Sequence, residues 1–301
     1  MFLLLKYTLL YTVVLMMVAL GGMFSERSGI INIALEGIMV IGGLIGVIAI
    51  QMMPAGSSAF SIVLVSILAA GIAGMIYAAL LAFASINLNA DQTIGGTALN
   101  LLATALAMVI AKGVNHSASA KLDYSNRAFI YDFGPLTVNV FLFIGLVALI
   151  LSYIVLYKTR LGLRLRACGE HPQAADSVGI NVYKMRYIGV LGGIGGMAYI
   201  IPSVSSWNFE VGVSGAGFLA LAVMIFGQWK PFRIFLAAVF FALFKSLANI
   251  ASSIPFLAEL GWTQNMYNMI PFIASMIILA FTSKKSRAPK AEGIPYDKGS
   301  R

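Results

Sequence analysis

The residue in this chain with the most evident chemistry is Glu36, a carboxylate inside the apolar run GIINIALEGIMVIGGLIGVIAI. An ionisable side chain at membrane depth costs about 3 kcal/mol or more unless it is paired or hydrated, so it indicates a functional site. Asn32 lies four residues earlier, which places it on the same face of a helix. Two interpretations stay open. In the first, the pair lines a pathway for a solute or ion; in the second, the role is structural, either as a buried polar pair that fixes helix packing or as a Glu36 shallow enough to reach the lipid headgroups.

A second polar cluster opens the next candidate helix, in the stretch NLNADQTIGGTALNLLA. Asp91 is the type of residue that caps a helix N-terminus, and we interpret it so. Asn100 lies about two turns further along, where its amide would bond either a polar solute or a neighbouring helix. We therefore predict Asn32, Glu36 and Asn100 as candidate residues of a translocation pathway.

Residues for catalysis or metal binding are not apparent in the sequence. No Gly-rich phosphate loop or metal-ligand spacing occurs, and the two histidines, His116 and His171, lie in separate polar stretches. The single cysteine, Cys168, excludes an intrachain disulfide and a metal cluster built on thiolates. We expect a protein that is not an enzyme and that binds no cofactor itself, so that a partner or an ion gradient supplies any energy.

The composition predicts a membrane protein. Hydrophobic residues make up 60% of the chain and charged residues 10%, against roughly a quarter charged in a soluble domain. The apolar residues form runs long enough to cross a bilayer, which requires about 20 residues in a helix. The fold class expected is all-α, a polytopic bundle of about nine helices (8–10). The predicted spans are 3–23, 28–52, 58–86, 93–112, 135–157, 186–203, 214–229, 232–251 and 266–283.

The polar segments between these spans predict the orientation. Residues 158–186, 230–233 and 284–301 are basic, and alternation of the spans places all three on one side, the cytoplasmic side under the positive-inside rule. The same alternation leaves the N-terminus outside, together with the mixed-charge loop at 113–134. We divide the chain into a permease domain, 1–283, with a cytoplasmic loop at about 158–186, and a basic cytoplasmic tail, 284–301.

Five stretches together resemble one family of transporters. Gln173-Ala174-Ala175-Asp176-Ser177-Val178-Gly179 resembles the Glu-Ala-Ala-x-x-x-Gly element of bacterial ABC importer permeases, with Gln in place of Glu. Residues 25–43, 91–103, 217–232 and 269–301 are similar to permeases of the branched-chain amino acid and simple sugar class, above all to its nucleoside-type branch, which works with basic-membrane-protein lipoproteins.

The resemblance implies a function and a set of partners. The chain would be the transmembrane permease subunit of an ATP-driven importer in the bacterial inner membrane, with nucleosides as the implied substrates. Gln173, Ala174, Ala175 and Gly179 would form the helix that docks on the ATPase, with Gly179 ending that helix and the two alanines giving it a flat outer face. The implied partners are a second permease, an ATPase with tandem nucleotide-binding domains that binds ATP and Mg, and an extracellular substrate-binding lipoprotein. Import of simple sugars or branched-chain amino acids stays open, as does an ion-coupled secondary transporter that uses Glu36.

Overall fold

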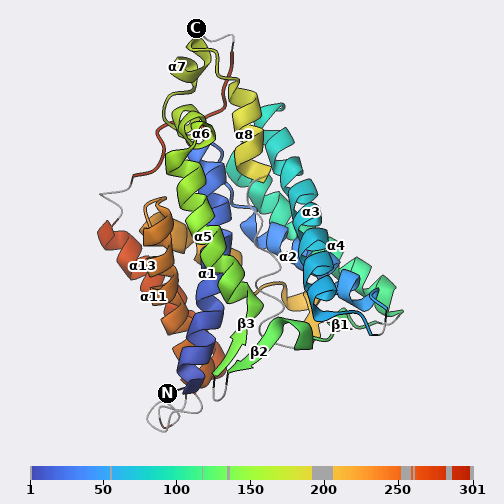
Figure 1. Cartoon of the computed structure of the whole chain (residues 1–301). Helices are drawn as coiled ribbons and strands as arrows, with labels where there is room; N and C mark the ends of the chain where they lie inside the picture. Colours follow the sequence, from blue (N-terminus) through green and yellow to red (C-terminus); the bar gives the residue numbers. More distant parts are fainter. Residues whose placement is uncertain are drawn as a thin grey trace.

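The computed structural model describes residues 2–54, 56–116, 118–133, 136–191, 206–251, 259, 262–282 and 287–298. These residues form an elongated bundle of helices, with the two chain ends at opposite ends of its long axis (Figure 1). The expected all-α, polytopic fold is confirmed. The two ends are called here the N-terminal end and the α7 end.

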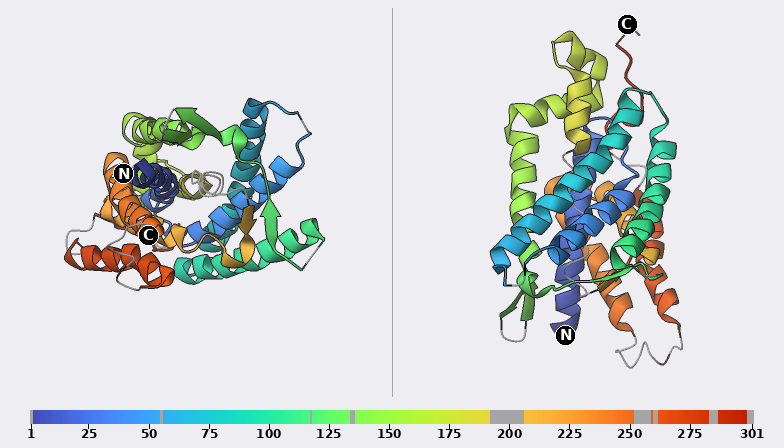
Figure 2. Two further views of the ribbon diagram at one scale, coloured as in Figure 1. Left: turned by 90° about the horizontal axis from the view of Figure 1, so that it is seen from below. Right: turned by 90° about the vertical axis from the view of Figure 1, so that its right-hand side faces the viewer.

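Five described helices are long and apolar enough to cross a membrane: α1 (Phe2–Arg27), α3 (Ala59–Ile86), α4 (Gln92–Asn115), α5 (Val140–Lys158) and α11 (Pro231–Ile250). Three further apolar helices are shorter, or have a shorter apolar part: α2 (Leu35–Gln51), α10 (Ala216–Phe226) and α13 (Gln264–Thr282). Helix α1 runs through the bundle and packs against α5, α8, α10 and α11 (Figure 2).

Several predicted spans differ from the helices that form. The span predicted at 28–52 begins as a helix only at Leu35, because the chain turns at Gly29, whose φ is +98°. The span predicted at 135–157 begins at Val140, where Asn139 caps the helix by accepting a hydrogen bond from the N–H of Phe141. The span predicted at 214–229 contains only the 11-residue helix α10. The span predicted at 186–203 begins earlier, in α8 (Val182–Leu191), and its remainder lies outside the described residues.

Two small antiparallel sheets lie at the N-terminal end. β1 (Lys121–Asp123) pairs with β4 (Ser206–Asn208), and β2 (Ile130–Phe133) pairs with β3 (Leu136–Asn139). Short 3-10 turns precede β2 and follow β4, at Arg127–Phe129 and Phe209–Val211. The segment expected to be a mixed-charge loop therefore contributes β1 and β2, and β1 pairs with a strand that lies far away in the sequence.

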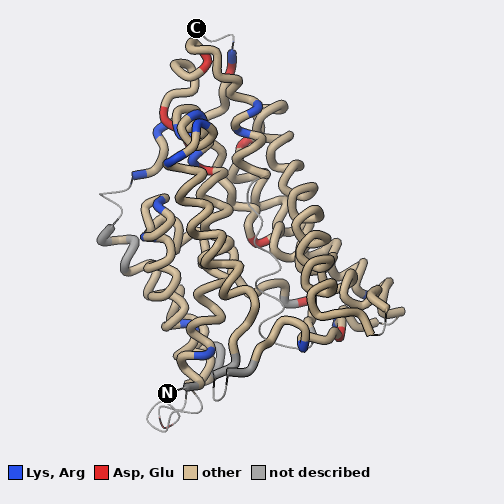
Figure 3. The backbone as a smooth tube through the Cα atoms, viewed as in Figure 1, with Lys and Arg blue, Asp and Glu red and all other residues tan. Residues whose placement is uncertain are grey.

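The opposite end carries the helices that follow α5, namely α6 (Arg160–Glu170), α7 (Pro172–Ser177) and α8. Figure 3 shows Lys and Arg gathered at this end. The three basic segments of the sequence meet here, since Lys230 lies within electrostatic reach of Arg27 and Arg287, and Arg27 forms an ion pair with Glu170 at 3.6 Å. The described basic residues of these segments therefore lie at one end of the bundle.

The outer faces of the bundle are apolar. Large hydrophobic side chains stand exposed along α3, α4 and α5, among them Leu68, Ile76, Leu101, Val109 and Ile150. In a bilayer such faces contact lipid tails or another membrane subunit, because no backbone polar group is left open on them. The candidate site lies at two non-helical segments, 28–34 before α2 and 212–215 before α10, which are called breaks here.

Candidate functional site

The carboxylate of Glu36 holds the start of helix α10. Glu36 lies in the first turn of α2, and its Oε1 accepts a hydrogen bond from the N–H of Gly215 at 2.8 Å, while its Oε2 accepts one from the N–H of Gly217 at 2.6 Å. The first N–H groups of a helix have no partner within the helix and carry its positive dipole end. Glu36 therefore caps α10 from a different helix, 179 residues earlier in the chain.

Glycine is required where α2 and α10 meet. A Cβ atom added to Gly217 would lie 2.5 Å from the backbone nitrogen of Glu36 and 2.6 Å from its Cα, which no side chain can tolerate. Gly215 has a φ of +76°, in the left-handed region that glycine adopts without strain. The two glycines bring the start of α10 within hydrogen-bond distance of the Glu36 carboxylate.

Lys245 is a second charged residue at this point, and the sequence reasoning missed it. It lies half-buried on α11, and its charge interacts attractively with that of Glu36. Its Nζ is 5.9 Å from the centre of the Phe272 ring. With Tyr11, Ser214 and Phe272 it borders a small cavity of about 10 Å³ beside the start of α10. A lysine inside the predicted span 232–251 was a visible signal, since charged residues within membrane helices are rare.

Asn100 closes the break in front of α2. Its Oδ1 accepts a hydrogen bond from the N–H of Gly37 at 2.7 Å, and its Nδ2 donates one to the carbonyl of Ile33 at 2.9 Å. The predicted bond to a neighbouring helix therefore forms. Gln92 also pairs with a backbone group in this break, since its Oε1 accepts a hydrogen bond from the N–H of Ile31 at 2.7 Å. Asp91 caps α4 as predicted, by accepting from the N–H groups of Thr93 and Ile94.

The sequence predicted that Asn32 shares a helical face with Glu36, and this prediction is wrong. It precedes the first residue of α2, in the non-helical segment 28–34. Its side chain is fully buried, and within the described residues neither its Oδ1 nor its Nδ2 has a hydrogen-bond partner. Leaving a buried amide unpaired is costly, which distinguishes Asn32 from Asn100, whose amide is paired through both its oxygen and its nitrogen.

The loop predicted to dock a partner forms a compact unit at the α7 end. Gln173, Ala174 and Gly179 are exposed, and Gly179 ends α7 as predicted, with a φ of +84°. Ala175 points inward instead. It is 3% exposed and packs in a small core, so the expectation that it belongs to a flat outer face is wrong. That core consists of Cys168, Ala175, Val182, Met185 and Tyr296.

The C-terminal residues 287–298 connect this unit to the break after α1. The N–H of Ala291 donates to the carbonyl of Gly169 in α6 at 2.8 Å, and the N–H of Gly293 donates to the carbonyl of Gly29 at 3.2 Å. Arg186 of α8, which is 1% exposed, donates to the carbonyl of Ile294 at 3.0 Å. The segment 287–298 is therefore packed into the protein rather than extending from it.

Two carboxyl groups meet under this segment. Glu26, near the end of α1, accepts a hydrogen bond from the indole N–H of Trp229 at 2.5 Å. Glu292 lies beside it, and burial raises the pKa of the Glu292 carboxyl, although the neighbouring Glu26 and the charge of Arg27 act in the opposite direction. Arg27 also donates to the carbonyl of Trp229 at 3.2 Å. These contacts join the end of α1, the turn before α11 and the C-terminal segment.

Within the described part of the chain, no group of three His, Cys, Asp or Glu side chains is placed to hold a metal ion. Cys168 is fully buried, and burial raises the pKa of its thiol to about 11, so the thiol is protonated and unreactive at neutral pH. The arrangement is suited to positioning helices rather than to making or breaking bonds.

A bundle of apolar helices with interrupted segments in its middle defines a polytopic membrane protein, and the comparisons with known proteins agree. Over residues 4–280 the chain matches the family described as branched-chain amino acid transport system / permease component. The nucleoside ABC transporter permease NupC of Lactococcus lactis is 38% identical, over 96% of this chain and 95% of the relative. The guanosine ABC transporter permease NupQ of Bacillus subtilis is 38% identical, over 98% of this chain and 96% of the relative.

A solved structure shares the fold. A metal-chelate type ABC transporter in an inward-facing conformation matches with a TM-score of 0.51 and 17% identity, over 93% of this chain and 85% of that chain. The chain belongs to the family of branched-chain amino acid transport system permease components. It is an ABC transporter permease subunit, an integral membrane transport component rather than an enzyme.

Replacing Asn100 with Leu should lower the stability of the bundle. The substitution keeps the approximate size of the side chain but leaves the N–H of Gly37 and the carbonyl of Ile33 unpaired, at about 1–3 kcal/mol for each buried group. Melting of the purified protein in detergent should therefore occur several degrees lower. Asn268→Leu on α13, at a partly exposed position, is the matched control and should melt like the wild type. Unchanged melting of Asn100→Leu would contradict the assigned bonds.

Glu36 and Lys245 should behave as a coupled pair. Glu36→Gln keeps the shape but removes the charge and one of the two acceptor oxygens, so both transport and melting temperature should fall. Lys245→Met should also destabilise the protein, because it leaves the carboxylate without its nearby cation. In the double variant the loss of unfolding free energy should be smaller than the sum of the single losses, by about 0.5–3 kcal/mol. Strictly additive losses, or full activity and normal melting of Glu36→Gln, would refute this interpretation.

The C-terminal segment should contribute to stability through Tyr296. This ring is 4% exposed and packs against Tyr183 with the ring centres 5.4 Å apart, so Tyr296→Ala should cost about 3 kcal/mol. Ile294→Ala is the control from the same segment, since its side chain is 56% exposed. Equal melting of the two variants would show that the segment is only loosely attached.

Proposed function

We propose that this chain is the transmembrane permease subunit of an ATP-driven importer of nucleosides. The observation that carries the proposal is similarity over nearly the whole chain to permeases named for nucleosides and for guanosine, both at 38% identity. An importer of this kind needs a membrane pathway, a connection to an ATPase and a means of passing motion from one to the other. The described residues offer a candidate for each of these parts.

Helix α7 is the candidate connection to the ATPase. Its exposed residues, Gln173 and Ala174, are followed by the exposed Val178 and Gly179, while Ala175 anchors the helix to the small core beneath. Val178 is 74% exposed and adds an apolar side chain to the exposed surface at the end of α7. We assign the docking contact to Gln173, Ala174, Val178 and Gly179, and the support of the helix to Ala175.

The start of α10 is the candidate moving part of the pathway. Glu36 and Lys245 bring opposite charges to this point, and the buried amide of Asn32 lies in the neighbouring break. Asn100 holds α2 in position and thereby positions Glu36. In this proposal Glu36, Lys245 and Asn32 belong to the pathway itself. Asn100 contributes indirectly, by holding the helix that carries Glu36 in position.

The orientation and the partners follow from the same features. The basic residues at the α7 end favour a cytoplasmic position for that end and for the C-terminus, under the positive-inside rule. The exposed apolar faces of α3, α4 and α5 suit contact with lipid and with a second permease. The remaining partners are an ATPase with tandem nucleotide-binding domains, which binds ATP and Mg, and an extracellular substrate-binding lipoprotein.

Uptake of radiolabelled guanosine into proteoliposomes containing the whole complex tests the proposal. Uptake should require ATP on the α7 side and should persist when an ionophore collapses the ion gradients. Uptake that follows the ion gradient without ATP would favour secondary transport through Glu36 instead. The substrate would be reassigned if guanosine, uridine and adenosine were neither taken up nor able to compete for uptake, while a sugar or a branched-chain amino acid was taken up.

Ala174→Arg should separate docking from folding. The position is exposed on α7, so the variant should insert and melt like the wild type but lose the ATPase and most ATP-driven uptake. Ala118→Arg, exposed at the N-terminal end, is the matched control and should retain both. Ala175→Arg should instead lower the melting temperature, because it forces a charge into the small core. Normal ATPase binding by Ala174→Arg would refute the docking role of α7.

A further inference from the structure

A pocket at the α7 end lies between the last turns of α5 and the first turn of α11. Its volume is about 400 Å³, and its lining combines three basic and three aromatic side chains: Tyr153, Tyr157, Lys158, Lys230, Phe232 and Arg233. Lys158 is the last residue of α5, and Lys230 immediately precedes α11. Both helices are long enough to span the membrane, so their ends at this pocket lie at the depth of the lipid headgroups.

The positive charges of the pocket lie close together. Among the described residues, the ion pairs Arg27–Glu170 and Lys121–Asp123 do not involve a cation of the pocket lining. The charge of Arg233 lowers the pKa of Lys230, and Arg287 and Arg27 add to this effect. Arg233 itself donates to the amide oxygen of Gln228 at 2.7 Å, a neutral acceptor that leaves its charge in place. Such a cluster attracts an anion.

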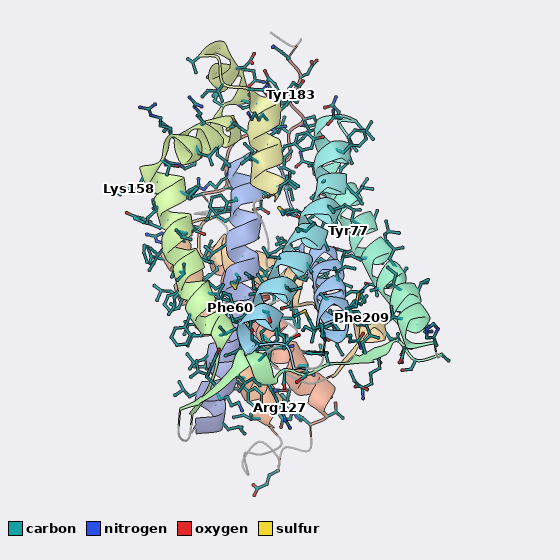
Figure 4. The ribbon with its side chains drawn as sticks, turned by 45° about the vertical axis from the view of Figure 1, so that its right-hand side comes forward. Phe60, Tyr77, Arg127, Lys158, Tyr183 and Phe209 are labelled. Carbon is teal, nitrogen blue, oxygen red and sulfur yellow. The ribbon has the colours of Figure 1, made fainter. Side chains whose placement is uncertain are left out.

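The aromatic side chains provide an apolar wall on the membrane side of these charges. Tyr153 lies one turn before Tyr157 on α5, and its ring is 5.1 Å from that of Phe232, centre to centre. Phe232 is 49% exposed on the outer face of α11. Arg166 covers the Tyr157 ring at 4.8 Å and extends the positive surface away from the membrane. Figure 4 shows Lys158 at the edge of the bundle, on the same half of the molecule as Tyr183 of α8.

We propose that this pocket binds the headgroup of an anionic phospholipid. Its phosphate would contact Lys158, Lys230 and Arg233, and the upper part of its acyl chains would pack on Tyr153 and Phe232. Basic pockets between membrane helices at the cytoplasmic surface bind acidic headgroups in this manner. A lipid is favoured over a protein partner because the pocket opens beside lipid-exposed apolar side chains, whereas α7 stands further out along the long axis (Figure 1). A lipid held here would link α5 to α11.

Native mass spectrometry of the purified full-length chain with phosphatidylglycerol or phosphatidylcholine tests this site. The wild type should bind phosphatidylglycerol in clear preference to phosphatidylcholine with the same acyl chains. Each basic residue near a membrane surface contributes about fivefold to such binding, so neutralising three should weaken it roughly a hundredfold. The pocket variant carries Lys158→Gln, Lys230→Gln and Arg233→Gln. The matched control neutralises three exposed lysines at the same end, outside this pocket, and should bind as the wild type does: Lys184→Gln, Lys290→Gln and Lys298→Gln.

The other outcomes overturn the proposal. Equal binding of the two lipids, or equal loss in both triple variants, would show that net charge rather than this pocket attracts the lipid. Displacement of phosphatidylglycerol by the same concentration of inorganic phosphate would show an unspecific anion site. Normal lipid binding by the pocket variant together with loss of the ATPase would show a protein-binding surface. If the triple variant melts abnormally, Phe232→Ala with all charges intact should still reduce phosphatidylglycerol binding several-fold, and no reduction would refute the site.

Discussion

The interior of a membrane offers no water to backbone groups at the ends of helices. The backbone groups at the breaks before α2 and α10 must therefore find their hydrogen-bond partners within the protein. The carboxylate of Glu36 accepts two N–H groups at the start of α10, and the amide of Asn100 bonds on both sides of the start of α2. The same short helix α2 therefore receives support from α4 and gives support to α10. Because each carboxylate oxygen of Glu36 accepts one N–H group of α10, moving α10 away from α2 would break both hydrogen bonds.

The C-terminal segment connects this region to the α7 end. It bonds to Gly169 of α6, to Gly29 in the first break and, through Arg186, to α8. The segment therefore links α6 and α8 to the turn after α1 through hydrogen bonds. Charged groups are grouped along the same route, with Glu26 and Glu292 beneath the segment and Glu36 with Lys245 at the start of α10. These charged side chains are thus placed where backbone segments meet, while the outer faces of α3, α4 and α5 expose large apolar side chains.

The residues differ in how far the sequence predicted their roles. The capping by Asp91 and the end of α7 at Gly179 were predicted correctly, because both depend on a few neighbouring residues. The helical pairing of Asn32 with Glu36 was wrong, because an apolar run does not mark the residue at which a helix begins, and α2 begins at Leu35. The outward position of Ala175 was wrong because a six-residue helix has no clear apolar face from which its orientation can be inferred. Lys245 was overlooked within an otherwise apolar run.

The sequence by itself determined the membrane class, the approximate positions of the apolar helices, the basic end and the family, since these depend on composition, run length and local motifs. The tertiary structure decided what the polar residues inside the bundle do. The partners of Asn100 lie 63 and 67 residues away, and those of Glu36 lie 179 and 181 residues away. All four are backbone groups, which carry no side-chain signature in the sequence. These backbone groups need side-chain partners because they lie where α2 and α10 begin. Those starting points become visible only in the folded chain.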